Sequence, residues 1–456
     1  MKTANKTVTA TRLVKDALEK AKHFEDYHIF TFLNEEGALK KAALIDEKIA
    51  RGEDAGKLAG VPYVLKDNFL SPEGETTASA HILEGFTSPI TATAVEKLEK
   101  EGAIMIGRVN MDAFAHGSST ESSYFGPTLN SHDKERVAGG SSGGSAVAVA
   151  LDIVEFATGT DTGGSIRQPA SFNGIYGLKP TYGTISRYGV VAMASSLDCI
   201  GFFTKTPEDM NLLMSIASGQ DPKDLTTLPD YYNATEAKTV KRVGIIKDFD
   251  NESVDAEIRQ ALKAKCEDLK SKGYEIVELE MPALKYALAA YYIIVPAEIA
   301  SNLSRYDGVR YGFRSEESKG LDELYKNTRG EGFMPENKRR IMIGNFVLSS
   351  GFYDAYFLKA AKARTLIVEE YTKAFEKCDV ILTPVAPNPA FKLGEKVNDP
   401  VSMYLEDVMS VPLNLAGVPG LTIPAGKTKA GLPLGLQLVG PRRSDKTLIE
   451  FSKELI

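Results

Sequence analysis

The chain has 456 residues, which is enough for two or three average domains or for one large α/β unit. Hydrophobic residues make up 43% of it and charged residues 25%, a composition typical of globular proteins that excludes long disordered regions. The net charge of -7 argues against a free-standing nucleic-acid-binding protein, because such proteins usually carry a basic surface, although a local basic patch stays open.

The cysteines and the apolar runs indicate the cellular compartment of the protein. The three cysteines lie far apart and show no CxxC spacing, so we expect reduced thiols and neither a disulfide set nor a zinc site. No apolar run reaches membrane-spanning length, and no signal-peptide core follows the first residues. These features predict a cytoplasmic protein without a membrane segment.

Hydrophobic periodicity predicts alternating helices and strands in the first half of the chain. The predicted helices cover residues 9–22, 35–50, 92–100, 146–150 and 206–218. The predicted strands cover residues 29–33, 58–68, 103–108, 155–159 and 175–180, with further strand-and-turn material at 183–187. The alanine- and valine-rich helix at 146–150 is expected to be buried.

A polar connection over 219–239 leads into a second α/β stretch. The predicted strands there cover 243–246, 275–279, 380–383, 421–424 and 434–439, and the predicted helices 255–272 and 284–303. Residues 305–338 are predicted to be a polar, partly helical excursion, 339–377 a long broken helical region, and the chain to end in a helix. This alternation favours one large α/β/α unit over 1–456 with a central mixed sheet covered by helices. Within it we distinguish an N-terminal helical segment (1–55), a core (58–218) and a second part (240–456).

Two serine clusters set in glycines flank the predicted helix at 146–150. The first reads GGSSGGS over 139–145 and the second DTGGSIRQ over 161–168. Glycine has no Cβ and allows positive φ, so it lets a ligand approach backbone N–H groups closely. This pattern suits a nucleophilic serine beside an oxyanion hole, and it also suits a phosphate-binding loop.

Two alternatives for these clusters are weak. Neither cluster has the GxxxxGK[ST] lysine of a phosphate loop, and neither gives GxGxxG between a clear strand and helix. A GxSxG elbow is also absent. All five histidines precede the serine clusters; His116 or His132 could fold back, but nothing around them orients an imidazole. We therefore expect the histidines at ordinary surface or loop positions.

Lys66 offers a base for a serine nucleophile, because it ends an apolar strand and is followed by Asp67 and Asn68. An isolated lysine is normally exposed, but this one follows a run that is expected to be buried. To act as a base it must lose its proton near neutral pH. Free lysine titrates near ~10.4, and lowering this by about three units requires roughly 4 kcal/mol, which burial can supply. Asp67 need not pair with Lys66, since successive strand side chains point to opposite faces.

The sequence resembles the amidase signature family. The resemblance rests on VPYVLKDN (61–68), GGSSGGS (139–145) and GTDTGGSIRQPA (159–170). Later segments resemble the glutamyl-tRNA(Gln) amidotransferase branch of that family: GLKPTYG (177–183), SRYG (186–189), ASSLD (194–198), DGVRYG (307–312), KRRI (338–341) and SSGFYDAY (349–356). The resemblance covers nearly the whole chain and implies the α/β amidase signature fold.

Roles for several residues follow from the resemblance alone. It implies that Ser165 is the nucleophile, that Ser141 is the bridging serine and that Lys66 is the base. Backbone N–H groups of the second cluster would form the oxyanion hole, namely those of Thr162, Gly163, Gly164 and Ser165. No metal site is implied.

The positions implied for glutamine binding are Tyr291, Arg340 and Asp407. An arginine suits the α-carboxylate of an amino acid and an aspartate its α-ammonium group. The assignment to Tyr291 competes with the adjacent Tyr292. His116 departs from the branch, which tends to have an apolar residue there, and this departure affects the pocket wall.

The function that the resemblance implies is hydrolysis of glutamine to glutamate and ammonia. In the branch, ammonia passes to a partner protein that uses ATP and Mg²⁺ to amidate Glu-tRNA(Gln), and in some members Asp-tRNA(Asn). The chain itself would need no cofactor and would assemble with the B and C subunits of the amidotransferase as a heterotrimer, the aminoacyl-tRNA being bound through the partner. Two alternatives stay open: a free-standing amidase acting on small amides, and a catalytically silent assembly protein.

Overall fold

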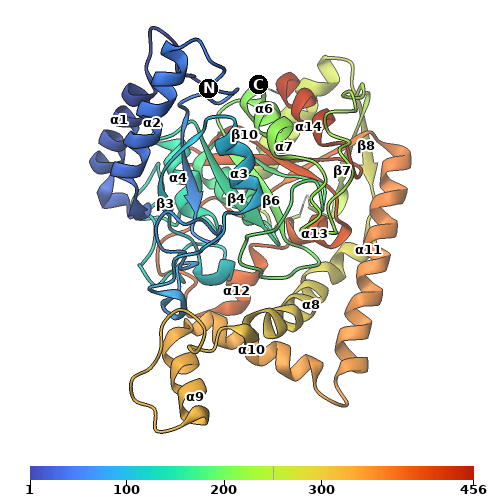
Figure 1. Cartoon of the computed structure of the whole chain (residues 1–456). Coiled ribbons are helices and arrows are strands. Elements are labelled where there is room, and N and C mark those ends of the chain that lie inside the picture. Colours follow the sequence, from blue (N-terminus) through green and yellow to red (C-terminus); the bar gives the residue numbers. More distant parts are fainter. Residues whose placement is uncertain (250, 456) are drawn as a thin grey trace.

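An eleven-stranded mixed sheet runs through the molecule, as the computed structural model of residues 1–249 and 251–455 shows (Figure 1). The strand order is β1-β3-β2-β4-β6-β5-β10-β11-β9-β7-β8. The predicted α/β class with a helix-covered mixed sheet is therefore confirmed. Residues 250 and 456, which belong to the predicted single unit, lie outside the described residues.

The strands of the sheet come from all parts of the chain. They are β1 (Phe30–Leu33), β2 (Pro62–Lys66), β3 (Ile104–Val109), β4 (Phe156–Asp161), β5 (Tyr176–Lys179), β6 (Cys199–Thr204), β7 (Arg242–Ile246), β8 (Glu275–Leu279), β9 (Val380–Pro384), β10 (Gly420–Lys427) and β11 (Pro433–Val439).

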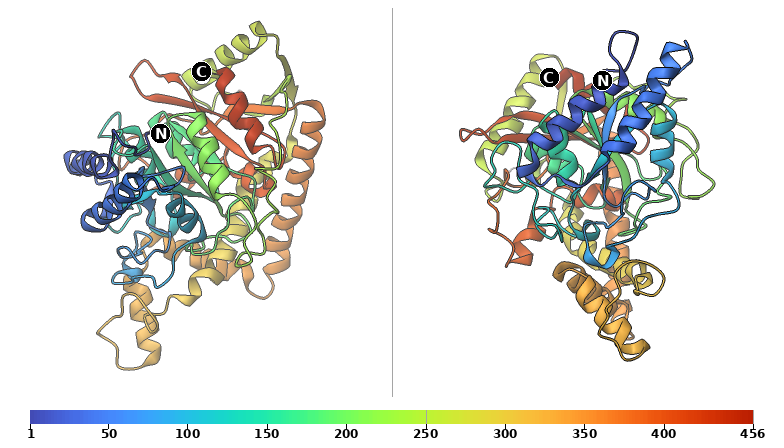
Figure 2. Two further views of the ribbon diagram at one scale, coloured as in Figure 1. Left: turned by 45° about the horizontal axis from the view of Figure 1, so that its top comes forward. Right: turned by 60° about the vertical axis from the view of Figure 1, so that its left-hand side comes forward.

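The α-helices lie on both faces and at the edges of the sheet (Figure 2). They are α1 (Ala10–His23), α2 (Glu35–Ala50), α3 (Thr93–Lys100), α4 (Gly143–Ala150), α5 (Arg167–Asn173), α6 (Pro207–Ala217), α7 (Ala256–Ser271), α8 (Ala287–Asn302), α9 (Leu321–Gly332), α10 (Pro335–Leu348), α11 (Leu358–Lys377), α12 (Pro400–Leu405), α13 (Val411–Ala416) and α14 (Asp445–Ser452). Figure 1 shows α1 and α2 on one side of the sheet, α11 on the other, and α9 projecting away from it.

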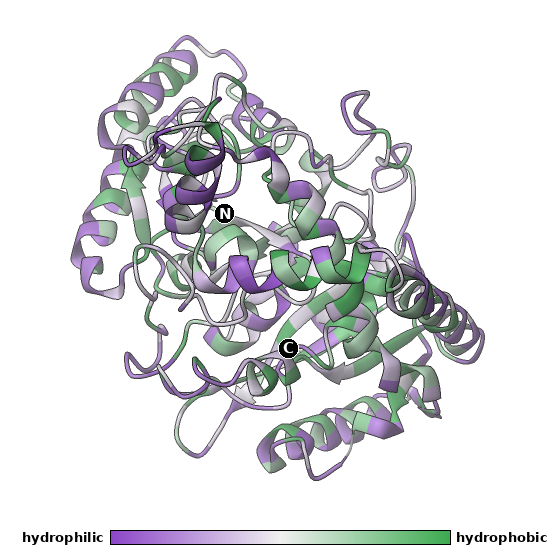
Figure 3. Ribbon diagram, turned by 90° about the horizontal axis from the view of Figure 1, so that it is seen from below, coloured by the Kyte–Doolittle hydropathy of each residue, from purple (hydrophilic) through white to green (hydrophobic). Residues whose placement is uncertain are grey.

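The central strands of the sheet lie in the interior of the molecule. Every residue of β2, β3, β4, β5 and β6 is buried, because helices cover both faces of this part of the sheet. Figure 3 shows hydrophobic residues on the strands and hydrophilic ones on the outer helices. α4, which the sequence predicts as a buried helix, packs on β4 and β2, with all but its last residue buried. It begins at Gly143, within the first serine cluster, so the sheet and this helix together fix where those serines lie.

Three elements of the core were not predicted from the sequence: β6, α5 and α13, the last with all six residues buried. β6 is a short, fully buried apolar run without alternation, a pattern that periodicity does not distinguish from other buried segments. α5 has seven residues and includes Pro169, so it shows no helical period. The expected strand-and-turn material at 183–187 forms no regular strand and pairs only through an isolated bridge between Ile185 and Ser218. The predicted break within 339–377 is confirmed, since α10 ends at Leu348 and α11 begins at Leu358.

One helical segment among the described residues, Pro282–Arg305, is long and apolar enough to cross a membrane, in contrast to the expectation that no apolar run reaches that length. Most of it is buried inside the fold, where α8 packs against α10 and α11. The core helix of a large globular unit passes the same test of length and composition.

Arg108 on β3 holds the loop that follows β2. Its guanidinium is fully buried and donates to the carbonyl oxygens of Phe69 (2.8 Å), Ser71 (3.0 Å) and Glu73 (2.9 Å). It also lies 3.7 Å from the Asp67 carboxylate. One side chain thereby fixes the path of the chain directly beyond Lys66.

We predict that Arg108→Met lowers the free energy of unfolding by about 3–5 kcal/mol, since it leaves the buried Asp67 carboxylate without its counter-charge and three carbonyl groups without their donor. Urea unfolding followed by circular dichroism measures this. The matched control is Arg12→Met, because Arg12 lies on the surface and, among the described residues, forms an ion pair only with Asp16 on its own helix; we expect no measurable change there. Equal effects of the two substitutions would contradict the structural role of Arg108.

Candidate active site

The ends of two neighbouring strands bring the predicted lysine and serines together. β2 and β4 pair in parallel, with Tyr63 opposite Phe156 and Val64 opposite Ala157. Their carboxyl ends therefore lie at the same edge of the sheet, where α/β proteins commonly place functional groups. Lys66 is the last residue of β2, and its N–H donates to the Thr158 hydroxyl of β4 at 3.0 Å. The first serine cluster enters α4 and the second follows β4, so both begin at this edge.

The Lys66 amine is enclosed by hydroxyl groups. The side chain is fully buried, and its Nζ lies 2.8 Å from Ser141 Oγ and 2.8 Å from Thr160 Oγ1. Asn68 donates to the same Thr160 oxygen at 3.1 Å. No carboxylate contacts Nζ within the described part of the chain. As expected, Asp67 does not pair with Lys66, since its carboxylate accepts from Thr77 and faces Arg108.

Burial sets the protonation state of Lys66. It lowers the pKa of the amine to about 7, and the negative charges of Asp112, Asp161 and Asp198 only partly oppose this. The Lys66 amine therefore loses its proton near neutral pH, about three units below an ordinary lysine. A neutral amine hydrogen-bonded to a serine can accept a proton from it.

The two serine clusters meet through their backbones. The Ser142 N–H donates to the carbonyl of Ser165 at 3.2 Å, and Ser142 is the residue after Ser141. Ser165 is 8% exposed, and within the described residues its hydroxyl has no hydrogen-bond partner. The expected relay is therefore formed between Lys66 and Ser141 but not between Ser141 and Ser165 in this structure. Catalytic hydrogen bonds are often long or misaligned before a substrate binds.

A buried ion pair holds the loop that carries Ser165. The Asp161 carboxylate and the Arg167 guanidinium are both fully buried and lie 2.9 Å apart. Burial alone would raise the pKa of Asp161, but the charge and hydrogen bonds of Arg167 outweigh this and keep that pKa well below its usual range. Arg167 also donates to Asn414 (2.6 Å) and Gln437 (3.1 Å). Neither member of the pair was singled out from the sequence, although both lie in the DTGGSIRQ motif.

The loop backbone agrees only in part with the predicted oxyanion hole. The N–H groups of Thr162, Gly163 and Ser165 have no acceptor among the described residues. The Gly164 N–H, in contrast, donates to Asp161 Oδ1 at 2.9 Å. The carboxylate that fixes the turn takes the Gly164 donor in this structure, so the predicted role of this N–H in the oxyanion hole stays a prediction.

The loop requires glycine at two positions, because a side chain would clash there and because one of the two has a positive φ. A Cβ on Gly163 would lie 2.5 Å from the Tyr291 hydroxyl. Gly164 has a φ of +135°, and a Cβ there would lie 2.5 Å from Ser410 Oγ. Thr162 is held from the other side, since its hydroxyl donates to Asp198 at 2.6 Å. The loop is thereby fixed between α8 and the segment before α13.

Tyr291 and Tyr292 have different surroundings. The Tyr292 hydroxyl donates to Asp407 Oδ2 at 2.7 Å, and its ring stacks on Tyr404 at 3.9 Å. The Tyr291 hydroxyl lies against Gly163 and has no hydrogen-bond partner among the described residues. Tyr291 is thus the tyrosine whose hydroxyl is available beside the serine loop, while the hydroxyl of Tyr292 is already engaged.

Arg340 and Asp407 form an oppositely charged pair of groups near these tyrosines. Arg340 is buried on α10; its Nε donates to Glu336 at 2.8 Å, and its guanidinium lies over the rings of Tyr292 and Tyr404. Asp407 is buried as well. Burial raises its pKa to about 6, against the lowering effect of the hydrogen bonds from Tyr292 and Ser118.

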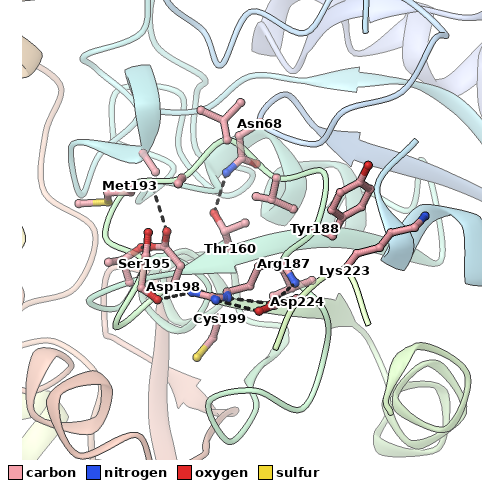
Figure 4. A pocket seen from close by; sticks show the side chains of 16 residues that line it. Asn68, Thr160, Arg187, Tyr188, Met193, Ser195, Asp198, Cys199, Lys223 and Asp224 are labelled. Atoms are coloured by element: carbon pink, nitrogen blue, oxygen red, sulfur yellow. Dashed lines mark hydrogen bonds and ion pairs between the residues drawn. The ribbon is translucent and has the colours of Figure 1, made fainter. Parts of the chain in front are cut away.

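Two cavities adjoin the site. One, of about 200 Å³, includes Asn68, Thr160, Thr162 and Asp198 in its lining, so it reaches the residues that contact Lys66 and the oxyanion loop (Figure 4). The other, of about 290 Å³, shares no lining residue with the first and is lined by Asp112, His116, Ser118, Arg340 and Tyr404 among others. Neither cavity is lined by Ser141 or Ser165.

The expectation that every histidine lies at the surface or in an ordinary loop is wrong for His116. Its side chain is fully buried, and its Nδ1 lies 2.8 Å from Asn337 Nδ2. Burial, and then the charge of Arg340, hold the pKa of His116 well below its usual range. His116 contacts neither serine, so it offers no second base for them. No group of three or more residues that could hold a metal ion occurs in residues 1–249 and 251–455.

Comparison with known proteins agrees with this geometry. The family model for amidases matches residues 12–449. The A subunit of glutamyl-tRNA(Gln) amidotransferase from Carboxydothermus hydrogenoformans is 49% identical over 98% of this chain and 93% of its own length. The protein of that name from Persephonella marina is 50% identical over 91% of this chain and 87% of its own length.

Solved structures give the same result. The crystal structure of the A subunit of glutamyl-tRNA(Gln) amidotransferase from Thermotoga maritima is 39% identical, with a TM-score of 0.80 over 96% of this chain and 90% of that one. A crystal structure of an amidase is 32% identical, with a TM-score of 0.83 over 98% of this chain and 95% of that one. The chain belongs to the amidase family.

We predict that the rate of amide hydrolysis rises about tenfold per pH unit below pH 7 and levels off above it. The folded-state pKa of Lys66 lies below the ordinary value of 10.5, so the neutral base appears as the pH passes about 7. Measuring kcat/KM between pH 5.5 and 9 on a simple amide without an α-ammonium group avoids the titration of Asp407. A profile that rises only near pH 10 would show that Lys66 is not the base.

Proposed function

We propose that this chain hydrolyses glutamine to glutamate and ammonia through Lys66, Ser141 and Ser165. The observation that carries the proposal is the 2.8 Å contact between a buried lysine amine, with a pKa lowered to about 7, and the Ser141 hydroxyl. That contact gives the serine clusters a base, whereas no histidine in the described part of the chain contacts them. A phosphate-binding role, the alternative left open by the glycine-rich pattern, has no use for a neutral buried lysine.

In the proposed mechanism Ser165 Oγ attacks the side-chain amide carbon of glutamine. Its proton passes to Ser141, whose own proton passes to Lys66. Backbone N–H groups of Thr162, Gly163 and Ser165 hold the developing oxyanion, with Gly164 contributing only if its bond to Asp161 is shared. When the C–N bond breaks, the proton returns through Ser141 to the leaving nitrogen, which departs as ammonia. Water then attacks the glutamyl ester, gives its proton to the same relay, and releases glutamate with Ser165 restored.

Glutamine would be recognised by groups of opposite charge. Arg340 would bind the α-carboxylate and Asp407 the α-ammonium group, since these charge-assisted hydrogen bonds are roughly twice as strong as neutral ones. Tyr291, whose hydroxyl lies beside Gly163, would contact the substrate next to the oxyanion loop. These groups favour an α-amino acid amide over a simple amide.

We further propose that the ammonia is used in a partner protein. The relatives at about half identity over nearly the whole chain are named as the A subunit of glutamyl-tRNA(Gln) amidotransferase, which supports assembly with further subunits. In this proposal the B and C subunits complete a cytoplasmic heterotrimer, and the partner uses ATP and Mg²⁺ to convert Glu-tRNA(Gln) to Gln-tRNA(Gln), with Asp-tRNA(Asn) as a second substrate of the same kind. The chain's net charge of -7 fits tRNA binding through the partner.

The proposal predicts distinct effects for Ser165→Ala in the assembled complex. Glutamine-dependent formation of Gln-tRNA should fall by a factor of at least about a thousand, while formation from added ammonia should persist, because the partner site is untouched. The measurement is Gln-tRNA formation with each nitrogen donor. Persistence of the glutamine-dependent reaction would contradict the role of Ser165, and it would favour a silent assembly protein.

Asp407→Asn tests glutamine recognition. Loss of the negative charge should raise KM for glutamine about ten- to a hundredfold, since a hydrogen bond between charged groups contributes roughly 1.5–3 kcal/mol. Steady-state glutaminase kinetics measure this, with Asp322→Asn on the exposed face of α9 as the control. An unchanged KM, together with rapid turnover of simple amides by the isolated chain, would favour the free-standing amidase.

A further inference from the structure

α10 carries a buried asparagine one turn before Arg340. Asn337 is fully buried, and its Nδ2 donates to the Ala113 carbonyl at 2.9 Å and contacts His116 Nδ1 at 2.8 Å. Its Oδ1 accepts the N–H of Met334 at 3.2 Å. The first turn of α10 is therefore bound to the segment at 113–116, which lies far away in the sequence.

These contacts determine the tautomer of His116. The Asn337 amide is oriented by two partners, since its oxygen faces an N–H and its nitrogen faces a carbonyl oxygen. The second hydrogen of that nitrogen is then donated to His116 Nδ1, which must be an acceptor. A neutral imidazole with an acceptor at Nδ1 carries its hydrogen on Nε2. His116 thus acts toward α10 only as a hydrogen-bond acceptor.

The same segment also holds the second charged group of the site. Ser118, two residues after His116, donates to Asp407 Oδ1 at 2.7 Å, and both His116 and Ser118 line the cavity that contains Arg340. Arg340 itself bonds to Glu336 of its own helix, a contact that cannot place the helix. Besides Asn337, the first turn of α10 is bound to another segment through Glu336, which accepts from Tyr404 at 2.9 Å. Residues 116–118 therefore connect the helix of Arg340 with Asp407.

We propose that His116 is a positioning residue for substrate selection: acting through Asn337, it sets the place of Arg340 relative to Asp407 and so favours an amide that carries both an α-carboxylate and an α-ammonium group. This inference rests on the proposed glutamine hydrolysis. It assigns a function to the histidine that departs from the pattern of the resembling branch. His116 needs to touch neither the substrate nor the serines for this role.

Two amide substitutions separate this role from general packing, since the smaller Asn disturbs the packing more than Gln but keeps the acceptor position. His116→Asn keeps an oxygen near the position of Nδ1, so it can accept from Asn337. His116→Gln places its amide one bond further out, near the position of Nε2, and leaves Asn337 Nδ2 without this acceptor. His132→Gln serves as the control, because His132 is exposed and lies outside the site. All variants are measured as full-length chains in the assembled complex, with glutamine and, separately, propionamide as the substrate.

We expect His116→Gln to raise KM for glutamine about tenfold with a smaller change in kcat, and His116→Asn to stay within about threefold of the unchanged protein. In His116→Gln the ratio of kcat/KM for glutamine to kcat/KM for propionamide should fall by about the factor by which KM for glutamine rises. Equal behaviour of the two variants, or a fall in kcat at unchanged KM, would overturn the proposal. Ser165→Ala, measured in parallel, tells the two failures apart: if it still hydrolyses glutamine, the proposed function itself is wrong.

Discussion

The burial of one lysine amine is the constraint on which the site depends. Lys66 ends a strand whose residues are all buried, and it meets only hydroxyl and amide groups there. Desolvation disfavours the charged form, and the nearest carboxylates do not contact Nζ, so the pKa falls to about 7. The sheet supplies this environment, because β2 lies between β3 and β4 within it. A lysine at an edge strand would keep its proton and could not serve as a base.

A second buried charge performs the opposite task. Asp161 stays ionised because Arg167 pairs with it, and it uses that charge to fix the turn before Ser165. The neutral lysine and the ionised aspartate lie at the ends of adjacent strands, β2 and β4. Different surroundings thus give two ionisable groups of one site different protonation states. Exclusion of water favours the neutral amine of Lys66, whereas the paired Arg167 keeps the equally buried Asp161 ionised. The Gly164 N–H donates to Asp161 in this arrangement, whereas the other N–H groups of the proposed oxyanion hole have no acceptor among the residues described.

Much of this could be predicted from the sequence, since long periodic helices and apolar strands carry their own signal. The contact of Lys66 with Ser141 is implied by the resemblance to the amidase signature family, and the structure places the two side chains 2.8 Å apart. β6 and α5 could not be predicted, because a short buried run and a proline-containing turn have no period of their own. The buried His116 contacts Asn337, which is 221 residues away, and the local sequence contains no sign of such a contact.

The most direct test of the account is the pKa of Lys66 itself. Nuclear magnetic resonance of the full chain with ¹³C at lysine Cε follows each amine through its titration, and the spectrum of Lys66→Arg identifies the signal. The account predicts a titration near pH 7, about three units below the ordinary lysine value, because burial removes the water that stabilises the ammonium form. A titration near pH 10 would mean that Lys66 is charged at neutral pH, and the serine–lysine mechanism would be contradicted.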